Sequence, residues 1–343
     1  MHLGKCGDHC GHWRNSRGVN LELFAINRLK RSSKLGTKSL LSVLESGSFA
    51  GFADASFEIS QCLMEVTDFD LWMVTRVIGD DYLVLCCVTS KYEIYNGDVF
   101  SWNDSICSRM ISTNGPRIVP DILDNVLYSQ APLVGRFPIR AYAGTPILMP
   151  DGSLFGMLCG LSRDAQTSDV KLHESSMLLC SKLLSTIVAF ELERCQLERL
   201  VDKLELETST TGGDARDYDR SAWKNMLAAE DDRVHRLAQP VSIALVTLLE
   251  SSSGECTDAI LEDAIERAII SIKGIPGIAS YVARVGSDQL AIVVCGVYGE
   301  TAESYARSVQ KNLKLSGIYS RTFCKSKRPE QSLVQLFEVM ENA

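Results

Sequence analysis

The sequence predicts an α+β protein in which a long helix joins two domains. Two pairs of apolar, strand-like segments, at 69–88 and 142–161, each enclose a turn. A long helical segment follows, and the remainder has the order strand, helix, hairpin, helix, strand. A length of 343 residues is typical of two domains rather than one.

The first domain has the pattern of one antiparallel sheet with helices on a single face. The turn sequences Gly79-Asp80-Asp81 and Pro150-Asp151-Gly152-Ser153 mark the two hairpins. We expect the second strand of the first hairpin to be the more buried one. The expected elements are helices at 39–44 and 53–66 and strands at 69–77, 82–88, 142–149 and 154–161, with a loop-rich stretch before the second hairpin.

Residues 168–207 are expected to form one long helix. Within it, residues alternate by four and three, which is the spacing of a coiled-coil seam. The seam continues well past the last strand of the first domain, and this favours a homodimer over the alternative of a solvated second half. A flexible joint follows at 208–213. The seam consists of Leu183, Ile187, Phe190, Arg194, Leu197, Val201 and Leu204, of which Arg194 is charged.

The last third of the chain has the element order of a ferredoxin-like palm. Gly286-Ser287-Asp288 forms the tight turn of its hairpin. The expected elements are helices at 220–237, 258–271 and 301–313, strands at 241–249, 279–285 and 289–295, a short strand near Ile318 and a final helix.

Composition and charge argue against several classes of protein. No uninterrupted apolar stretch of about 18 residues is present, so we expect no membrane span, and the charged start is unlike a secretion signal. The net charge of −8 argues against a nucleic-acid partner, although residues 1–38 contribute +6 and the rest −14. Most of the twelve cysteines lie in apolar runs, which is typical of free thiols in a cytoplasmic protein.

Residues 141–164, AYAGTPILMPDGSLFGMLCGLSRD, combine a strand with a Gly-x-Pro-like step, an Asp-Gly turn and a Gly-rich strand that closes on Asp164. Together with the segment NGPRIVPDI at 114–122, this pattern resembles the GAF family over residues 41–190. GAF domains are small-ligand and protein-interaction modules that are common in bacterial signalling. The resemblance therefore implies a sensory or dimerisation domain.

Residues 282–293, VARVGSDQLAIV, resemble the hairpin that bears the signature of the GGDEF family, whose members join two GTP molecules into cyclic di-GMP. The resemblance covers residues 214–343 and leaves residues 191–213 as a helical, coiled-coil-like linker. Residues 1–40 precede both resemblances, and we expect them to be a basic, disordered N-terminal segment. The five signature positions are Gly286, Ser287, Asp288, Gln289 and Leu290.

Two positions that carry metal-binding acids in the GGDEF family have uncharged residues in this sequence. Phosphoryl transfer of this type needs divalent cations, and Mg²⁺ prefers anionic oxygen ligands. One of the family's metal-binding acids falls at Thr247 here, and the other is the fourth signature residue, Gln289. Asp288 remains, but one carboxylate cannot hold two cations. We therefore expect a catalytically inactive, degenerate domain with no catalytic residue and no metal.

Other parts of the family's site also lack a counterpart. The guanine-reading residues would fall in 251–256, SSSGEC, and the inhibitory Arg-x-x-Asp motif would fall at 277–280, where Gly277 and Ser280 replace its arginine and aspartate. Product binding at that motif is not expected.

A GAF pocket would lie between the sheet and its overlying loops. We expect it to be lined by Trp72, Tyr82, Trp102, Ile118, Asp121, Tyr142, Thr145 and Met157, although for any one of them packing in the core is the alternative. Residues 121–141 contain neither Cys nor His, which argues against a covalently bound bilin, and we expect no cofactor.

Two further groups of residues carry little signal. The segment CGDHCGH at 6–12 has residue types that bind metals, but its spacing matches no standard structural zinc site. Three of the five histidines lie in the first 12 residues, and neither His173 nor His235 has a nucleophile motif beside it.

These observations predict a cytoplasmic, homodimeric signal-transduction protein. A GAF domain would act on a degenerate GGDEF-like output or interaction domain, with an unidentified small molecule and an unidentified signalling protein as partners. Two alternatives remain open: a divergent diguanylate cyclase that retains some activity through Asp288 and Glu250, and a structural adaptor without a ligand.

Overall fold

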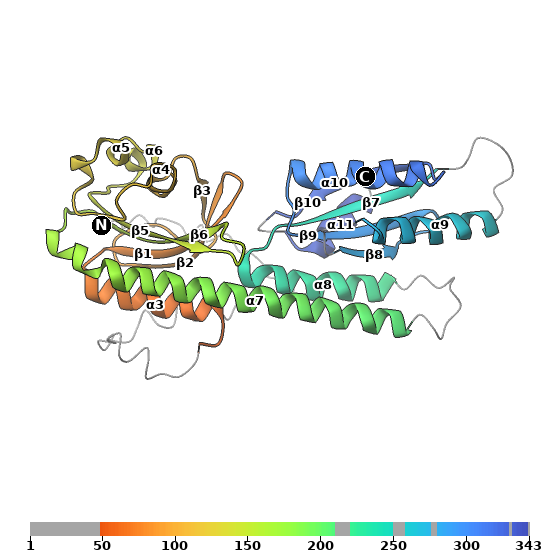
Figure 1. The fold of residues 1–343 in the computed structure, drawn as a ribbon, viewed down its shortest axis with the longest axis horizontal. Coiled ribbons are helices and arrows are strands. Elements are labelled where there is room, and N and C mark those ends of the chain that lie inside the picture. Colours follow the sequence, from red (N-terminus) through yellow and green to blue (C-terminus); the bar gives the residue numbers. More distant parts are fainter. Residues whose placement is uncertain (1–48, 210–219, 250–257, 276–279, 329–330, 342–343) are drawn as a thin grey trace, which may run out of the picture. The chain divides into compact units, whose positions relative to one another are not determined.

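The computed structural model describes residues 49–209, 220–249, 258–275, 280–328 and 331–341. Within these ranges the chain forms one six-stranded and one four-stranded antiparallel sheet, each accompanied by helices (Figure 1), and the predicted α+β class is confirmed. The helix expected at 39–44, the basic segment and the Cys/His segment at 6–12 lie outside the described residues.

The first sheet has the strand order β3-β2-β1-β6-β5-β4. The four strands predicted for the two hairpins are present, and the short outer strands β3 and β4 were not predicted. The expectation that β2 would be more buried than β1 is wrong, because β1 lies inside the sheet between β2 and β6. The strands are β1 Leu71–Ile78, β2 Asp81–Thr89, β3 Val99–Ser101, β4 Ile118–Val119, β5 Ala141–Leu148 and β6 Leu154–Ser162.

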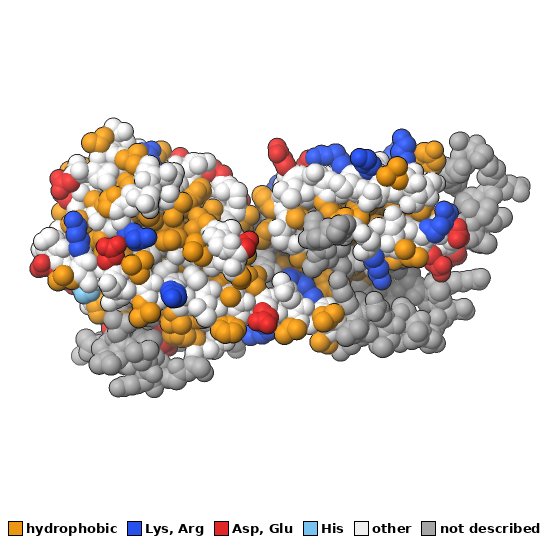
Figure 2. Space-filling model, in the orientation of Figure 1, with side chains coloured by type: hydrophobic (Ala, Val, Ile, Leu, Met, Phe, Trp, Pro, Cys, Tyr) orange, Lys and Arg blue, Asp and Glu red, His pale blue; other side chains and the backbone are white. Residues whose placement is uncertain are grey.

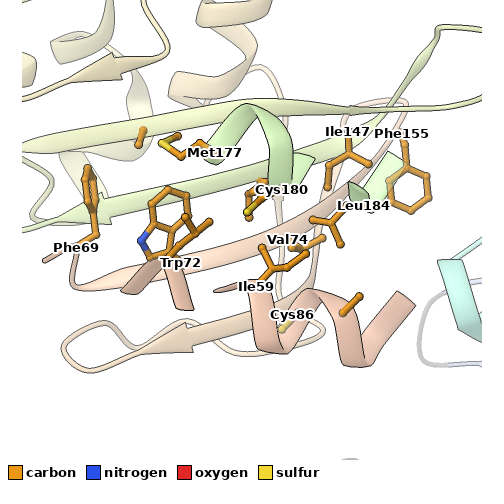
Figure 3. Packing of buried hydrophobic residues seen from close by; sticks show 14 of the residues in the cluster. Ile59, Phe69, Trp72, Val74, Cys86, Ile147, Phe155, Met177, Cys180 and Leu184 are labelled. Carbon is orange, nitrogen blue, oxygen red and sulfur yellow. The ribbon is translucent and has the colours of Figure 1, made fainter. Parts of the chain in front are cut away.

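One face of this sheet packs against two long helices, α3 (Phe52–Thr67) and α7 (Glu174–Ser209). Figure 3 shows the core between them, in which Trp72 and Val74 of β1 meet Ile59 of α3 and Leu184 of α7. The Trp72 ring of β1 lies directly over Gly160 of β6. Position 160 requires a glycine, because a Cβ atom there would lie 2.8 Å from this ring.

The opposite face is covered as well, so the expectation of helices on a single face is wrong. Its cover consists of short helices whose apolar residues are too few to give a clear period in the sequence. They form a second core with the sheet. These helices are α4 (Ile106–Thr113), η2 (Ile122–Asp124), α5 (Val126–Ser129) and α6 (Pro132–Arg136).

The long helix α7 follows a short 3-10 turn, η3 (Ser168–His173). It begins six residues later than predicted, because residues 168–173 form η3, and its end lies within two residues of the predicted one. Among the residues that the structure describes, the stretch Ser168–Asp202 is long and apolar enough to cross a membrane by length and composition alone, and an 18-residue window within it has a mean hydropathy of 1.4. One third (33%) of its most apolar 18-residue window is buried within the protein.

The second sheet has the order β10-β7-β9-β8, which in a βαββαβ chain is the ferredoxin-like arrangement. Helices α9 and α10 pack on one face and α8 and α11 on the other. The last strand, β10, is longer than predicted and starts after Ile318. The elements are α8 Arg220–Leu237, β7 Val241–Leu248, α9 Asp258–Lys273, β8 Ser280–Arg284, β9 Gln289–Cys295, α10 Glu300–Leu315, β10 Ser320–Ser326 and α11 Leu333–Glu341.

Candidate functional site

Thr247 and Gln289, the two positions predicted to have lost a metal-binding acid, are direct cross-strand partners. Thr247 lies near the end of β7, and Gln289 begins β9. Residues directly opposite in an antiparallel pair have Cβ atoms about 4.5–5.5 Å apart. The alternation along both strands directs the two side chains to the same face of the sheet. A hydroxyl and an amide thus occupy adjacent positions where two carboxylates would form a cation site.

The signature hairpin is held by its own arginine. Arg284 donates from Nε to the Gly286 carbonyl at 3.0 Å and from Nη2 to the Ser287 carbonyl at 2.9 Å. Its Nη1 donates to both carboxylate oxygens of Glu262 on α9, at 2.8 and 2.9 Å. This guanidinium is therefore occupied by the turn and by α9, where it forms an ion pair with Glu262.

The side chains at the remaining signature positions are buried in the core or lie at the turn. Leu290 is fully buried, Ser287 is exposed, and the Asp288 carboxylate lies 3.4 Å from the Ser287 hydroxyl. The Asp288 carbonyl accepts a hydrogen bond from Leu248 N at 2.8 Å, which ties the turn to β7. Within the described residues, no group of three or more His, Cys, Asp and Glu side chains is placed to hold a metal ion.

The eight residues proposed for the GAF pocket do not gather at one site. Tyr82, Trp102, Tyr142 and Met157 lie on the face that the short helices cover. Trp72 and Ile118 lie in the core under α3 and α7, and strand alternation directs Thr145 to that side too.

Asp121, the eighth candidate, has a local structural role. It caps η2 by accepting from Leu123 N, and it forms an ion pair with Arg140 at 2.5 Å. The Arg140 guanidinium and the Leu123 amide lower the pKa of the Asp121 carboxyl below its usual value. Asp121 thus bonds to the protein itself, to Leu123 and Arg140, and this geometry is that of a residue that stabilises a turn.

The face covered by the short helices contains a polar cluster that we name the Tyr–Cys cluster: Tyr82, Cys107, Tyr142 and Cys159. The hydroxyl of Tyr82 donates to Cys107 Sγ at 3.2 Å and lies 3.4 Å from Cys159 Sγ. The hydroxyl of Tyr142 donates to Cys107 Sγ at 3.3 Å. All four side chains are buried. Position 144 needs a glycine, because a Cβ atom there would lie 2.1 Å from the Tyr142 hydroxyl.

The burial and contacts of this cluster shift the pKa values of its members in opposite directions. Burial raises the pKa values of Tyr82 and Tyr142 well above their usual range, so both stay protonated and able to donate. Burial alone would raise the pKa of Cys107, but hydrogen bonds from Cys159, Tyr142 and Tyr82 lower it instead. The pKa of Cys159 is raised by its hydrogen bond with Cys107 and by burial.

A buried charge network, which the sequence did not reveal, joins α7 to α8 and β9. Arg199 of α7 donates from Nε and Nη2 to the carboxylate of Glu230 on α8, at 2.6–3.1 Å, and Glu230 is 0% exposed. Cys295 of β9 adds a thiol donor to the same carboxylate at 3.1 Å. Arg233 of α8 contacts both Glu230 and Asp202.

The opposite side of α7 presents apolar residues to solvent. Of the predicted seam, Leu183, Phe190, Leu197 and Val201 are exposed, with Phe190 at 66% and Leu197 at 57%. Ile187 is half-buried against the sheet core, and Arg194 forms ion pairs with Glu191 and Glu198 along the helix. In the space-filling view, hydrophobic side chains recur along the path of α7 (Figure 2).

Comparison with known proteins gives only distant structural similarities. No family model and no curated protein matches the chain. The bacteriophytochrome RpBphP3 from R. palustris is 14% identical with a TM-score of 0.44, over 96% of this chain and 75% of that one. The structure of its chromophore-binding domain alone is 17% identical with a TM-score of 0.33, over 48% of this chain and 58% of that one.

Two other solved structures are similar to shorter parts of the chain. The GAF domain from an Acinetobacter phosphoenolpyruvate-protein phosphotransferase is 12% identical with a TM-score of 0.35, over 50% of this chain and 94% of that one. A DGC protein from Thermotoga maritima is 21% identical with a TM-score of 0.30, over 37% of this chain and 95% of that one.

Proposed function

We propose that this chain is a cytoplasmic signal-transduction protein. In this proposal, a GAF sensory and dimerisation domain acts through α7 on a catalytically inactive GGDEF-like domain, which serves as an output or interaction module. The resemblance of residues 141–164 and 282–293 to these two families supports the assignment of the domains.

The observation that most supports an inactive output domain is the neutral pair of Thr247 and Gln289. Two divalent cations around a triphosphate need anionic oxygens from the protein. The pair offers a hydroxyl and an amide at adjacent positions of β7 and β9, and Arg284 neutralises Glu262 nearby. Asp288 remains as a lone carboxylate at the turn.

The experiment that tests this proposal is incubation of the purified protein with GTP and Mg²⁺ or Mn²⁺. We expect no cyclic di-GMP. Product that forms with the native chain and disappears in Asp288→Ala would instead establish a divergent cyclase with residual activity.

The two faces of α7 support its role as the connection between the domains. One face packs on the first sheet and then, through Arg199, on Glu230 of the second domain. The other face exposes the apolar seam, which in a parallel or antiparallel pair of helices would be buried by a second copy. A homodimer would remove this apolar surface from water, and we propose this arrangement rather than a membrane span.

A structural adaptor without a ligand is the second candidate function. The packing of Tyr82, Tyr142 and Met157, all 1% exposed or less, favours it, because these side chains fill the face where a GAF ligand is expected. A thermal-shift screen with nucleotides and metabolites separates the two functions, since a ligand that binds the folded state raises the melting temperature. An increase with one class of compound would support a sensor, and no increase would support the adaptor.

A further inference from the structure

Cys107 lies in the first turn of α4, which Ser105 caps by accepting from Ser108 N. The unpaired amides at a helix start favour negative charge and lower the pKa of a cysteine placed there. Two phenol hydroxyls, from Tyr82 and Tyr142, also donate to its sulfur. These donors come from β2 and β5, so the sheet itself supplies the stabilisation of a Cys107 thiolate.

A second thiol lies directly beside the first. Cys159 projects from β6 onto the same face of the sheet, where one phenol oxygen, that of Tyr82, contacts both sulfurs. The Cys159 thiol lies 3.4 Å from the Tyr82 oxygen. Either atom can be the donor in this contact. A thiolate next to a protonated thiol is the arrangement of an attacking and a resolving cysteine.

We propose that Cys107 and Cys159 form a peroxide-responsive pair that closes to a disulfide between α4 and β6. The Cys107 thiolate attacks one oxygen of hydrogen peroxide, and the O–O bond breaks. The hydroxide that leaves takes up from solvent the proton that Cys107 released on ionising, which gives the first water. Cys159 then attacks the sulfur of the Cys107 sulfenic acid, and the S–O bond breaks. The second water leaves with the Cys159 proton. Two thiols are oxidised and one peroxide is reduced.

The burial of the pair selects the oxidant. Both sulfurs are buried between α4 and the sheet, so a small uncharged oxidant such as hydrogen peroxide needs less opening of this cover than a bulky disulfide such as oxidised glutathione. The other nearby thiol, Cys87, is separated from Cys159 by one strand, because Met73 of β1 is the cross-strand partner of both. That separation is about 9–10 Å, which is beyond disulfide reach without movement of the backbone.

This inference is independent of the catalytic state of the second domain. Oxidation would bond α4 covalently to β6, the strand that leads into η3 and α7. The Tyr142 hydroxyl would at the same time lose a thiolate as its acceptor. The disulfide would therefore restrict the movement of α4 relative to β6. Because β6 is followed by η3 and α7, this restriction lies next to the long helix.

Peptide mass spectrometry of the full chain tests the proposal directly. Trypsin releases Cys107 in peptide 92–109 and Cys159 in peptide 141–163, and each peptide contains a single cysteine. After treatment of the reduced protein with stoichiometric hydrogen peroxide, we expect these two peptides to be disulfide-linked. In Cys159→Ser, we expect Cys107 to be trapped by dimedone as a sulfenic acid.

Two kinds of variant separate this chemistry from a purely structural role. Tyr82→Phe with Tyr142→Phe keeps the rings but removes both donors, and we expect Cys107 to be oxidised at least about tenfold more slowly, because a hydrogen bond to a charged group is worth roughly one pKa unit or more. Cys87→Ser, on the same face, is the matched control and should form the linked pair at the native rate. Linkage of Cys87 to Cys159, peroxide resistance of both thiols, or an unchanged rate in the double tyrosine variant would each overturn the proposal.

Discussion

Thr247 of β7 and Gln289 of β9 face each other across adjacent strands of the second sheet. In the sequence the two positions are 42 residues apart, but in the structure they form one site. Because cross-strand neighbours share their surroundings, a cation bound at one position would also contact the other. The absence of charge at both positions therefore acts as a single electrostatic change.

Restoring the two acids should create a cation site. In Thr247→Asp with Gln289→Glu, two carboxylates would repel each other across the strands, so we expect a lower melting temperature than in the native chain. Addition of Mn²⁺ should restore much of the loss, because the metal binds only the folded state. Thr322→Asp, on β10, controls for an added charge on the same sheet. An equal response to Mn²⁺ in the native chain would contradict this account.

The exposed seam of α7 should control oligomeric state. Phe190→Glu combined with Leu197→Glu places charges on side chains that are exposed in a single copy, so the monomer should fold normally, while a paired helix would have to bury them. We expect sedimentation velocity to show a dimer for the native chain and a monomer for the variant. Ile270→Glu makes the same change at an exposed position of α9 and should remain dimeric. A native chain that sediments as a monomer would contradict the proposed seam.

The buried network between α7 and α8 should be sensitive to the loss of one charge. Glu230→Gln leaves Arg199 and Arg233, which are both at least nine-tenths buried, without their shared carboxylate. Breaking a buried ion pair in this way costs about 3–5 kcal/mol of unfolding free energy.

Chemical denaturation measures this cost against an exposed pair. Asp263→Asn removes the partner of Arg267 on the surface of α9 and should cost no more than about 1 kcal/mol. Similar losses in the two variants would show that the Arg199–Glu230 contact does not stabilise the fold.

Glu198 should contribute to the acid sensitivity of the same contact. Hydrogen bonds from Arg236 and Arg233 hold its pKa below the usual value, so the ionised form is favoured in the folded state. Its stabilisation is thus fully present above the unfolded pKa, near about 4.3, and is lost as the pH falls through the lower folded pKa. We expect the stability difference between the native chain and Glu198→Gln to shrink on acidification from pH 7 to pH 3. A difference that stays constant would contradict this assignment.

Elements with a strong apolar period were predictable from the sequence, and those with polar or short patterns were not. Helix α8 and strand β9 have the predicted bounds. Strand β10 was placed too early, because its sequence SRTFCKS is largely polar and only its first residue, Ser320, is buried. Helix α4 was missed because its eight residues hold too few apolar positions to show a helical period.

The candidate site was less predictable, because it depends on which face of a strand a side chain occupies. The strand containing Trp72 was predicted, but its alternation directs Trp72 toward α3 and α7 and Met73 toward the short helices. Nothing in the sequence links Cys107 to Cys159, because their proximity arises only from the packing of α4 on β6. Glu230 and Arg199 likewise lie on different helices, and their pairing follows from the packing of α7 on α8.

The most direct test of the inactive output domain is a crystal structure of the native chain with a non-hydrolysable GTP analogue and Mn²⁺. Anomalous scattering locates manganese without reference to protein density. The account predicts no manganese within coordination distance of Thr247, Asp288 or Gln289. Two manganese ions bound between Thr247 and Gln289, with the triphosphate across them, would contradict it.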